Sequence, residues 1–139
     1  MVEVLSTRRE VRAGRRLSLV IEVDGLLCGQ YIMDGINHGT RSAEVGVWLD
    51  VDHVGRRVAQ AAAMLLGDHT FGPMGLYRVT APIAVDNVPA TILARQLGFH
   101  REGIMASYLD VGGRRKDHVL WALTADQWRS VKERRERRQ

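Results

Sequence analysis

Apolar and polar residues alternate with a period of two in the first third of the chain. The β-branched run Leu17–Val23 predicts a strand, Asp24 and Gly25 form a two-residue turn, and Leu26–Met33 predicts the returning strand. The more polar segment at residues 1–12 contains valines seven positions apart, which predicts a short helix. We therefore expect a helix followed by a β-hairpin.

A third alternating stretch, Ser42–Leu49, follows a loop rich in Gly, Asn and Thr at residues 34–41. Side chains two positions apart lie on the same face of a strand. One face of this strand is small and aliphatic, and the other carries Ser42, Glu44, Gly46 and Trp48. Glu44 and Trp48 are therefore expected on the same side of the sheet.

The period then changes from two to about 3.6, which indicates a helix that ends at Gly72-Pro73. A strand is expected at 77–83, followed by a helix that is capped by Asp86-Asn87 and stopped by Gly98. Two more strands are expected at 99–110 and 116–123. The capping box Thr124–Gln127 then predicts the start of a terminal helix. The resulting order, β-β-β-α-β-α-β-β-α, predicts an α/β fold with a mixed sheet and a right-handed crossover near its middle.

The length of 139 residues fits one domain, expected over residues 1–139. The net charge of +4 is concentrated in the basic segment 129–139, while the rest of the chain is neutral. This tail is expected to be a solvated helix end, and nucleic acid is not an expected partner because a phosphate-binding domain carries basic charge on its folded body as well.

The remaining composition narrows the class of protein. One cysteine, Cys28, cannot form an internal disulfide, and residues near Met1 do not resemble a secretion signal, so a cytoplasmic location is expected. No apolar run approaches the roughly 20 residues that span a bilayer, so no membrane role is expected. The five histidines show no metal-ligand spacing, and no metal site is expected.

Four stretches resemble motifs of the GNAT superfamily of acyl-CoA-dependent N-acetyltransferases, and in particular of its RimJ/RimL branch. They occur in the same order and at the same spacing as in that family. They are Ala43-Glu-Val-Gly-Val-Trp-Leu49, Val54-Gly-Arg-Arg-Val-Ala59, Asp86-Asn87 followed by Gln96-Leu-Gly-Phe99 and Arg101-Glu-Gly103, and Arg114-Arg-Lys-Asp-His-Val-Leu-Trp-Ala-Leu123. The resemblance covers about residues 17–128. It implies acetyl transfer to a primary amine, with a central β-α-β-α unit that binds acetyl-CoA.

A pyrophosphate is held well by a loop that leads into a helix, because the first N–H groups of a helix have no partner within it. Residues 54–59 are expected to be such a loop. The fixed positions of the family pattern fall on Val54, Arg57 and Ala59, of which only Ala59 agrees. Arg57 either obstructs the pyrophosphate or, with Arg56, supplies compensating charge; the alternative is an ordinary helix start. Cofactor contacts are expected from Trp48, Leu49, Val54, Gly55, Arg56, Arg57, Val58, Ala59 and Asn87.

Glu44 is the expected general base, since attack by an amine requires removal of a proton and the family places a strand glutamate about ten residues before its pyrophosphate loop. The alternative is a solvated strand glutamate. Backbone N–H groups near Val47–Leu49 are expected to hold the thioester oxygen. Many family members have a tyrosine as the acid at the position of Ala94 and a serine at the position of Ala90, and both are replaced here by alanine. Tyr108 is therefore the nearest candidate acid; the alternative is that it is a packed strand aromatic. Asn87 either contacts the cofactor or caps its own helix.

The acceptor implied by the resemblance is an amine, either a protein N-terminus or a small molecule. Complete family members have a strand and two helices before the segment that begins here near Arg16, so the acceptor site is open, completed by a partner in a homodimer, or lost. The last case would make the chain a CoA-binding pseudoenzyme or interaction module without turnover.

Overall fold

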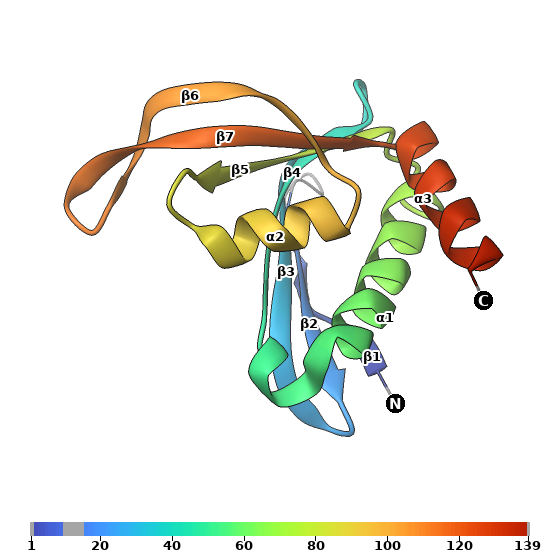
Figure 1. The fold of residues 1–139 in the computed structure, drawn as a ribbon. Helices are drawn as coiled ribbons and strands as arrows, with labels where there is room; N and C mark the ends of the chain where they lie inside the picture. Colours follow the sequence, from blue (N-terminus) through green and yellow to red (C-terminus); the bar gives the residue numbers. More distant parts are fainter. Residues whose placement is uncertain (1, 10–15, 139) are drawn as a thin grey trace. The chain divides into compact units, whose positions relative to one another are not determined.

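The structure, a computed structural model, describes residues 2–9 and 16–138. It divides into two compact units, residues 1–77 and residues 78–139, which are described separately below. Both units combine antiparallel strands with helices (Figure 1).

The first unit consists of four antiparallel strands and one long helix. They are β1 (Val2–Arg9), β2 (Leu17–Val23), β3 (Leu26–Asn37), β4 (Ser42–Leu49) and α1 (Val51–Phe71). Each strand pairs with the next in the sequence, and α1 lies beside β1, β2 and β3 (Figure 1). The alternate side chains Leu19, Ile21, Tyr31, Met33 and Val45 are buried, as are Ala62 and Leu66 of α1. The alternation that predicted the strands therefore marks the core of this unit.

The second unit has three strands and two helices. They are β5 (Arg78–Ala84), α2 (Val88–Gln96), β6 (His100–Val111), β7 (Arg114–Thr124) and α3 (Ala125–Arg137). Strand β7 pairs antiparallel with both β5 and β6. Buried Ala94 of α2 packs with Val119 and Trp121 of β7, so α2 covers one face of these strands (Figure 1).

The predicted helix at residues 1–12 is wrong over its described part, because residues 2–9 form β1 and pair with β2 from Val2↔Val23 to Arg9↔Leu17. Residues 10–12 lie outside the described residues. The segment Val2-Glu3-Val4 also alternates between apolar and polar residues, so the sequence is compatible with both a helix and a strand. Pairing with the complete neighbouring strand β2 favours the strand. A strand thus precedes β2, separated from it by residues 10–16.

The predicted hairpin is confirmed, with Asp24 and Gly25 in the left-handed region (φ 51° and 83°) that such a two-residue turn requires. Strand β3, however, extends into the loop expected at residues 34–41 and ends at Asn37. The Asn37 side chain accepts hydrogen bonds from the N–H groups of Gly39 (2.9 Å) and Thr40 (3.0 Å). This local turn of an asparagine side chain sets the end of the strand.

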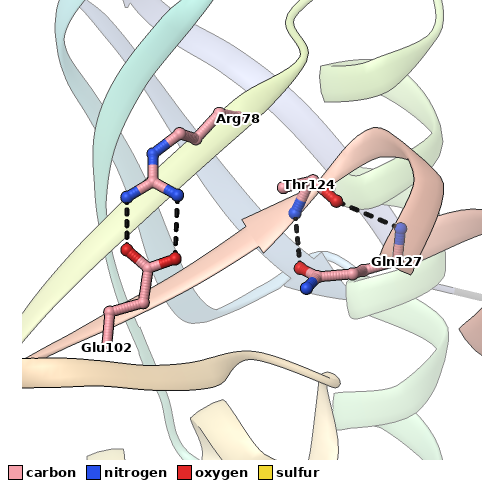
Figure 2. A network of polar contacts seen from close by, with 4 residues as sticks. All are labelled: Arg78, Glu102, Thr124 and Gln127. Carbon is pink, nitrogen blue, oxygen red and sulfur yellow. Dashed lines mark hydrogen bonds and ion pairs between the residues drawn. The ribbon is translucent and has the colours of Figure 1, made fainter.

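The terminal helix begins at the predicted capping box. The Thr124 hydroxyl accepts from the Gln127 N–H (3.2 Å), and the Gln127 side chain accepts from the Thr124 N–H (2.9 Å). Figure 2 shows this box beside the Arg78–Glu102 pair, in which the two terminal guanidinium nitrogens, Nη1 and Nη2, donate to the carboxylate. The pair is exposed and so contributes at most about 1 kcal/mol.

The basic tail is helical up to Arg137, but its expected full solvation is wrong at Arg135. Arg135 Nη2 donates to the Gln96 carbonyl (2.9 Å), and Nη1 is buried with no hydrogen-bond partner among the described residues. Burial lowers the pKa of Arg135. One arginine of the charge run therefore anchors α3 to the end of α2.

Tyr31 of β3 is buried against α1, where its hydroxyl lies 3.3 Å from that of Thr70. Burial raises the pKa of Tyr31 to about 12, while a tyrosine in the unfolded chain has a pKa of about 10. Above pH 10 only the unfolded chain releases this proton, so folding stability falls between pH 10 and 12. The loss at pH 11 is about 1.4 kcal/mol.

Replacing Tyr31 by phenylalanine is therefore expected to reduce the alkaline loss of stability by this amount. Urea unfolding at pH 9 and pH 11 measures it, with Tyr77→Phe, at a 40% exposed tyrosine, as the control. An equal alkaline loss in Tyr31→Phe and the wild type would contradict the expectation.

Candidate active site

Strand β4 presents the polar face that its sequence predicted. Glu44, Gly46 and Trp48 are exposed, with Trp48 at 51%, whereas on the opposite face Ala43 and Val45 are buried and Val47 is half-buried. A side chain added at Gly46 would meet no atom within 4 Å. Glu44 and Trp48 thus flank open space on one face of the strand.

The same face continues onto β3, because residues directly opposite one another in antiparallel strands share a face. Asp34 is paired with Glu44, and Gln30 is paired with Trp48. Arg16 lies 3.7 Å from the Asp34 carboxylate. Two carboxylates therefore stand side by side on this face, and Arg16 lies beside one of them.

The backbone register of β4 fixes where its N–H groups point. The Asp50 N–H donates to the Cys28 carbonyl (2.7 Å), in step with the pairing of Trp48 with Gln30. In an antiparallel ladder, alternate residues direct their N–H groups to the same neighbour. The N–H groups of Val47 and Leu49 consequently point to the edge of β4 away from β3.

The expected loop at residues 54–59 is wrong, because α1 already begins at Val51. Counted from the N-cap residue Asp50, N–H groups from the fifth position onward, Val54 and beyond, bond to carbonyls one turn earlier. The N–H groups without a partner inside α1 are therefore those of residues 51–53. The anion-binding end of this helix was thus predicted about one turn too late.

The side chains of the expected cofactor-binding segment differ in exposure. Those of Val54, Gly55 and Arg56 lie outside the described side chains. Arg57 is exposed, Val58 is half-buried, and Ala59 is buried at 7% in the core of the first unit. Arg57 is thus the exposed one of these three described side chains.

Asn87 caps its own helix, which is one of the two roles expected for it. Its Oδ1 accepts from the Ala90 N–H (3.3 Å), at the start of α2. The neighbouring Asp86 carboxylate accepts from Lys116 Nζ (2.5 Å), which lowers the pKa of Asp86. The start of α2 is thus tied to β7, and a contact of Asn87 with a cofactor stays a prediction.

Tyr108 is half-buried on β6 and packs edge-on against His118 of β7, with ring centroids 5.3 Å apart and planes at 67°. It lies beside a bulge, since the pairing of β6 with β7 shifts register between Met105 and Leu109. The sequence contained the Asp117-His118 pair, but the pairing of His118 with Tyr108 depends on a bulge that no local pattern announced.

A family model described as "Acetyltransferase (GNAT) domain" matches residues 3–100, more than half of the chain. The chain belongs to the GNAT acetyltransferase family. The match runs across the boundary between the two units, and the assignment of residues 1–139 to one GNAT domain stays a prediction.

Two relatives of this GNAT chain are named for different acceptors. The putative ribosomal N-acetyltransferase YdaF of Bacillus subtilis is 30% identical over 78% of this chain and 60% of its own length. The spermidine N(1)-acetyltransferase of Escherichia coli is 28% identical over 78% of this chain and 59% of its own length. The chain therefore spans about three fifths of the length of these relatives.

Among solved structures, Mycobacterium smegmatis RimJ in complex with CoA-disulfide is 39% identical, with a TM-score of 0.76. The likeness covers 85% of this chain and 57% of RimJ. It confirms the predicted α/β GNAT fold and the resemblance to the RimJ branch.

Two further properties were expected from the composition of this GNAT chain. Among the described residues, no group of three or more His, Cys, Asp or Glu side chains is arranged to hold a metal ion. In the same part of the chain, every helix is too short or too polar to cross a membrane.

Sequence reasoning missed Asp34 and His118. Asp34 was assigned to a loop, although strand β3 brings it opposite Glu44. His118 received no role of its own, because the five histidines show no metal-ligand spacing. The feature that distinguishes His118 is its burial, with only 5% of the residue exposed, and burial can be seen only in the folded structure.

Proposed function

We propose that this chain is an N-acetyltransferase that moves an acetyl group from acetyl-CoA to a primary amine. The observation that carries the proposal is the family match, supported by the 39% identity to a RimJ structure that contains a CoA-disulfide. The residues fit the co-substrate, because three helix-start N–H groups at 51–53 suit a pyrophosphate and lie directly after the strand that carries Glu44 and Trp48.

Acetyl-CoA supplies an activated acetyl group as a thioester. Glu44 removes a proton from the amine, directly or through one water, so that nitrogen can attack. The N–H groups of Val47 and Leu49 donate to the thioester oxygen as it gains charge. As the C–N bond forms and the C–S bond breaks, the nitrogen loses its second proton to solvent. Tyr108 donates its proton to sulfur and later recovers one from solvent, and Glu44 releases its own proton to solvent.

The acceptor that we propose is a primary amine on a protein N-terminus or on a small molecule. Glu44 and Asp34, paired on adjacent strands, would attract it in its protonated form before Glu44 takes the proton. Residues 10–16 alone separate β1 from β2. We therefore include a second copy of the chain as a candidate partner that completes the acceptor site, which light scattering would detect as twice the monomer mass.

Calorimetry with acetyl-CoA, followed by assay of CoA release with a panel of peptides and polyamines, tests the proposed function. Micromolar binding with amine-dependent CoA release is the expected result. Binding without release from any amine would instead identify a CoA-binding module without turnover, and absence of binding would overturn both.

Arg57 gives a separate test of the cofactor site. The side chain is exposed one turn beyond the N–H groups at residues 51–53, so we expect it to attract the pyrophosphate rather than obstruct it. Arg57→Ala should raise the Kd for acetyl-CoA about tenfold, the size of a lost charge-assisted hydrogen bond. Arg129→Ala, on α3, is the control, and a lower Kd in Arg57→Ala would identify an obstruction.

A further inference from the structure

The bulge in β6 holds a serine in a conformation that serines rarely adopt. Ser107 has a φ of 47°, in the left-handed region that costs a residue with a side chain about 1 kcal/mol. The shift of register between Met105 and Leu109 places this residue within the bulge, directly before Tyr108. Bulges of this kind re-aim side chains next to functional sites.

Two side chains of β7 fasten the backbone of this bulge. Asp117 Oδ1 accepts from the Ser107 N–H (2.8 Å). Arg115 Nη2 donates to the Ser107 carbonyl (2.8 Å) and lies 3.4 Å from the Tyr108 carbonyl. Residues 115 and 117 are two apart on a strand and therefore act from the same face. The strained conformation is thus held by specific partners.

His118 holds the Tyr108 ring. It is buried at 5%, and its Nδ1 lies 3.0 Å from the Lys116 carbonyl. A carbonyl can only accept, so Nδ1 carries the hydrogen and the imidazole plane is fixed by the backbone of its own strand. Against this fixed ring the Tyr108 ring packs edge-on.

We propose that Asp117 and His118 are positioning residues for Tyr108. Because adjacent residues of a strand point to opposite faces, Asp117 fixes the backbone directly before Tyr108 while His118 fixes its ring. Together they determine where the phenol oxygen lies. The inference rests on the proposed function, in which that phenol protonates the departing sulfur.

Substitutions that separate backbone from ring test the proposal. Asp117→Ala frees the Ser107 N–H, whereas Asp117→Asn keeps an oxygen acceptor. We expect Asp117→Ala to lower kcat about tenfold with the KM for acetyl-CoA within twofold, and Asp117→Asn to keep most of kcat. His118→Ala should lower kcat similarly, while His118→Phe, which keeps a ring against Tyr108, should lower it less. Asp126→Ala, at another exposed aspartate, is the control.

A double-mutant cycle distinguishes positioning from general loss of structure. Tyr108→Phe alone should lower kcat about tenfold, and adding Asp117→Ala should then have no further effect, because both act through one phenol. Hydrogen exchange of the Ser107 amide should accelerate at least tenfold in Asp117→Ala.

The possible failures can be told apart. Full multiplication of the two kcat effects, or an unchanged Ser107 amide, overturns the positioning role and leaves the proposed function standing. Wild-type kcat in Tyr108→Phe would overturn both the positioning role and the role of Tyr108 as the acid, while acetyl transfer with Glu44 as the base would still stand. Absence of turnover in the wild-type protein with every amine overturns the proposed function and this role with it.

Discussion

Replacing Glu44 by glutamine is expected to lower kcat for acetyl transfer about 100-fold at pH 7, the lower end of what a positioned base contributes. Glutamine keeps the size of the side chain on the exposed face of β4 but cannot accept the proton of an ammonium group. The Kd for acetyl-CoA should stay within twofold, because the N–H groups assigned to the pyrophosphate belong to α1.

The pH profile and a matched variant make the Glu44 test specific. As pH rises toward the pKa of the acceptor amine, more of the amine is neutral without help, so Glu44→Gln should recover part of its kcat. Asp34→Asn removes the carboxylate opposite Glu44 and should raise the KM of a cationic amine while changing kcat less than threefold. Turnover of Glu44→Gln within threefold of wild type at pH 7 would remove Glu44 from the mechanism.

Gly98→Ala is expected to destabilise the protein by about 3 kcal/mol, through two costs that add. Gly98 has a φ of 90°, which disfavours any residue with a side chain. In addition, a Cβ atom there would lie 2.5 Å from Cγ2 of Val131, a buried β-branched residue of α3 that cannot turn aside. The glycine thus stops α2 and also lets α3 approach closely.

A matched glycine separates the two costs at Gly98. Gly113 has a similar φ of 83° but no atom within 4 Å of an added Cβ, so Gly113→Ala should cost only about 1 kcal/mol. Adding Val131→Ala to Gly98→Ala should cost less than the sum of the two single changes. Urea unfolding followed by tryptophan fluorescence measures each value. Equal losses at positions 98 and 113 would refute the close approach of α3.

Local patterns predicted most of the fold because each acts over a few residues. The bounds of β2 and β4 agree with the alternating stretches residue for residue, and the capping box opens α3 where expected. Strand β1 was missed because its short segment is compatible with both a helical and a strand period. Its structure comes from the hydrogen bonds that β2 offers along its whole length.

The candidate site was predictable where one strand carries it and unpredictable where two strands meet. The shared face of Glu44 and Trp48 follows from spacing alone. The position of Asp34 opposite Glu44 needed the length of β3, and the contact of Tyr108 with His118 needed the bulge in β6. Pairing register arises from the whole sheet and has no counterpart in a short sequence window.

The antiparallel pairing of both β5 and β6 with β7 also orders events during synthesis. Within the second unit, residues 78–111 emerge from the ribosome before the strand that both must join, which spans residues 114–124. Until then the nascent chain exposes two strand edges and the apolar side of α2, the kind of surface that chaperones recognise. Translation that stops before residue 114 would therefore leave an aggregation-prone product, while the first unit already has all of its strands.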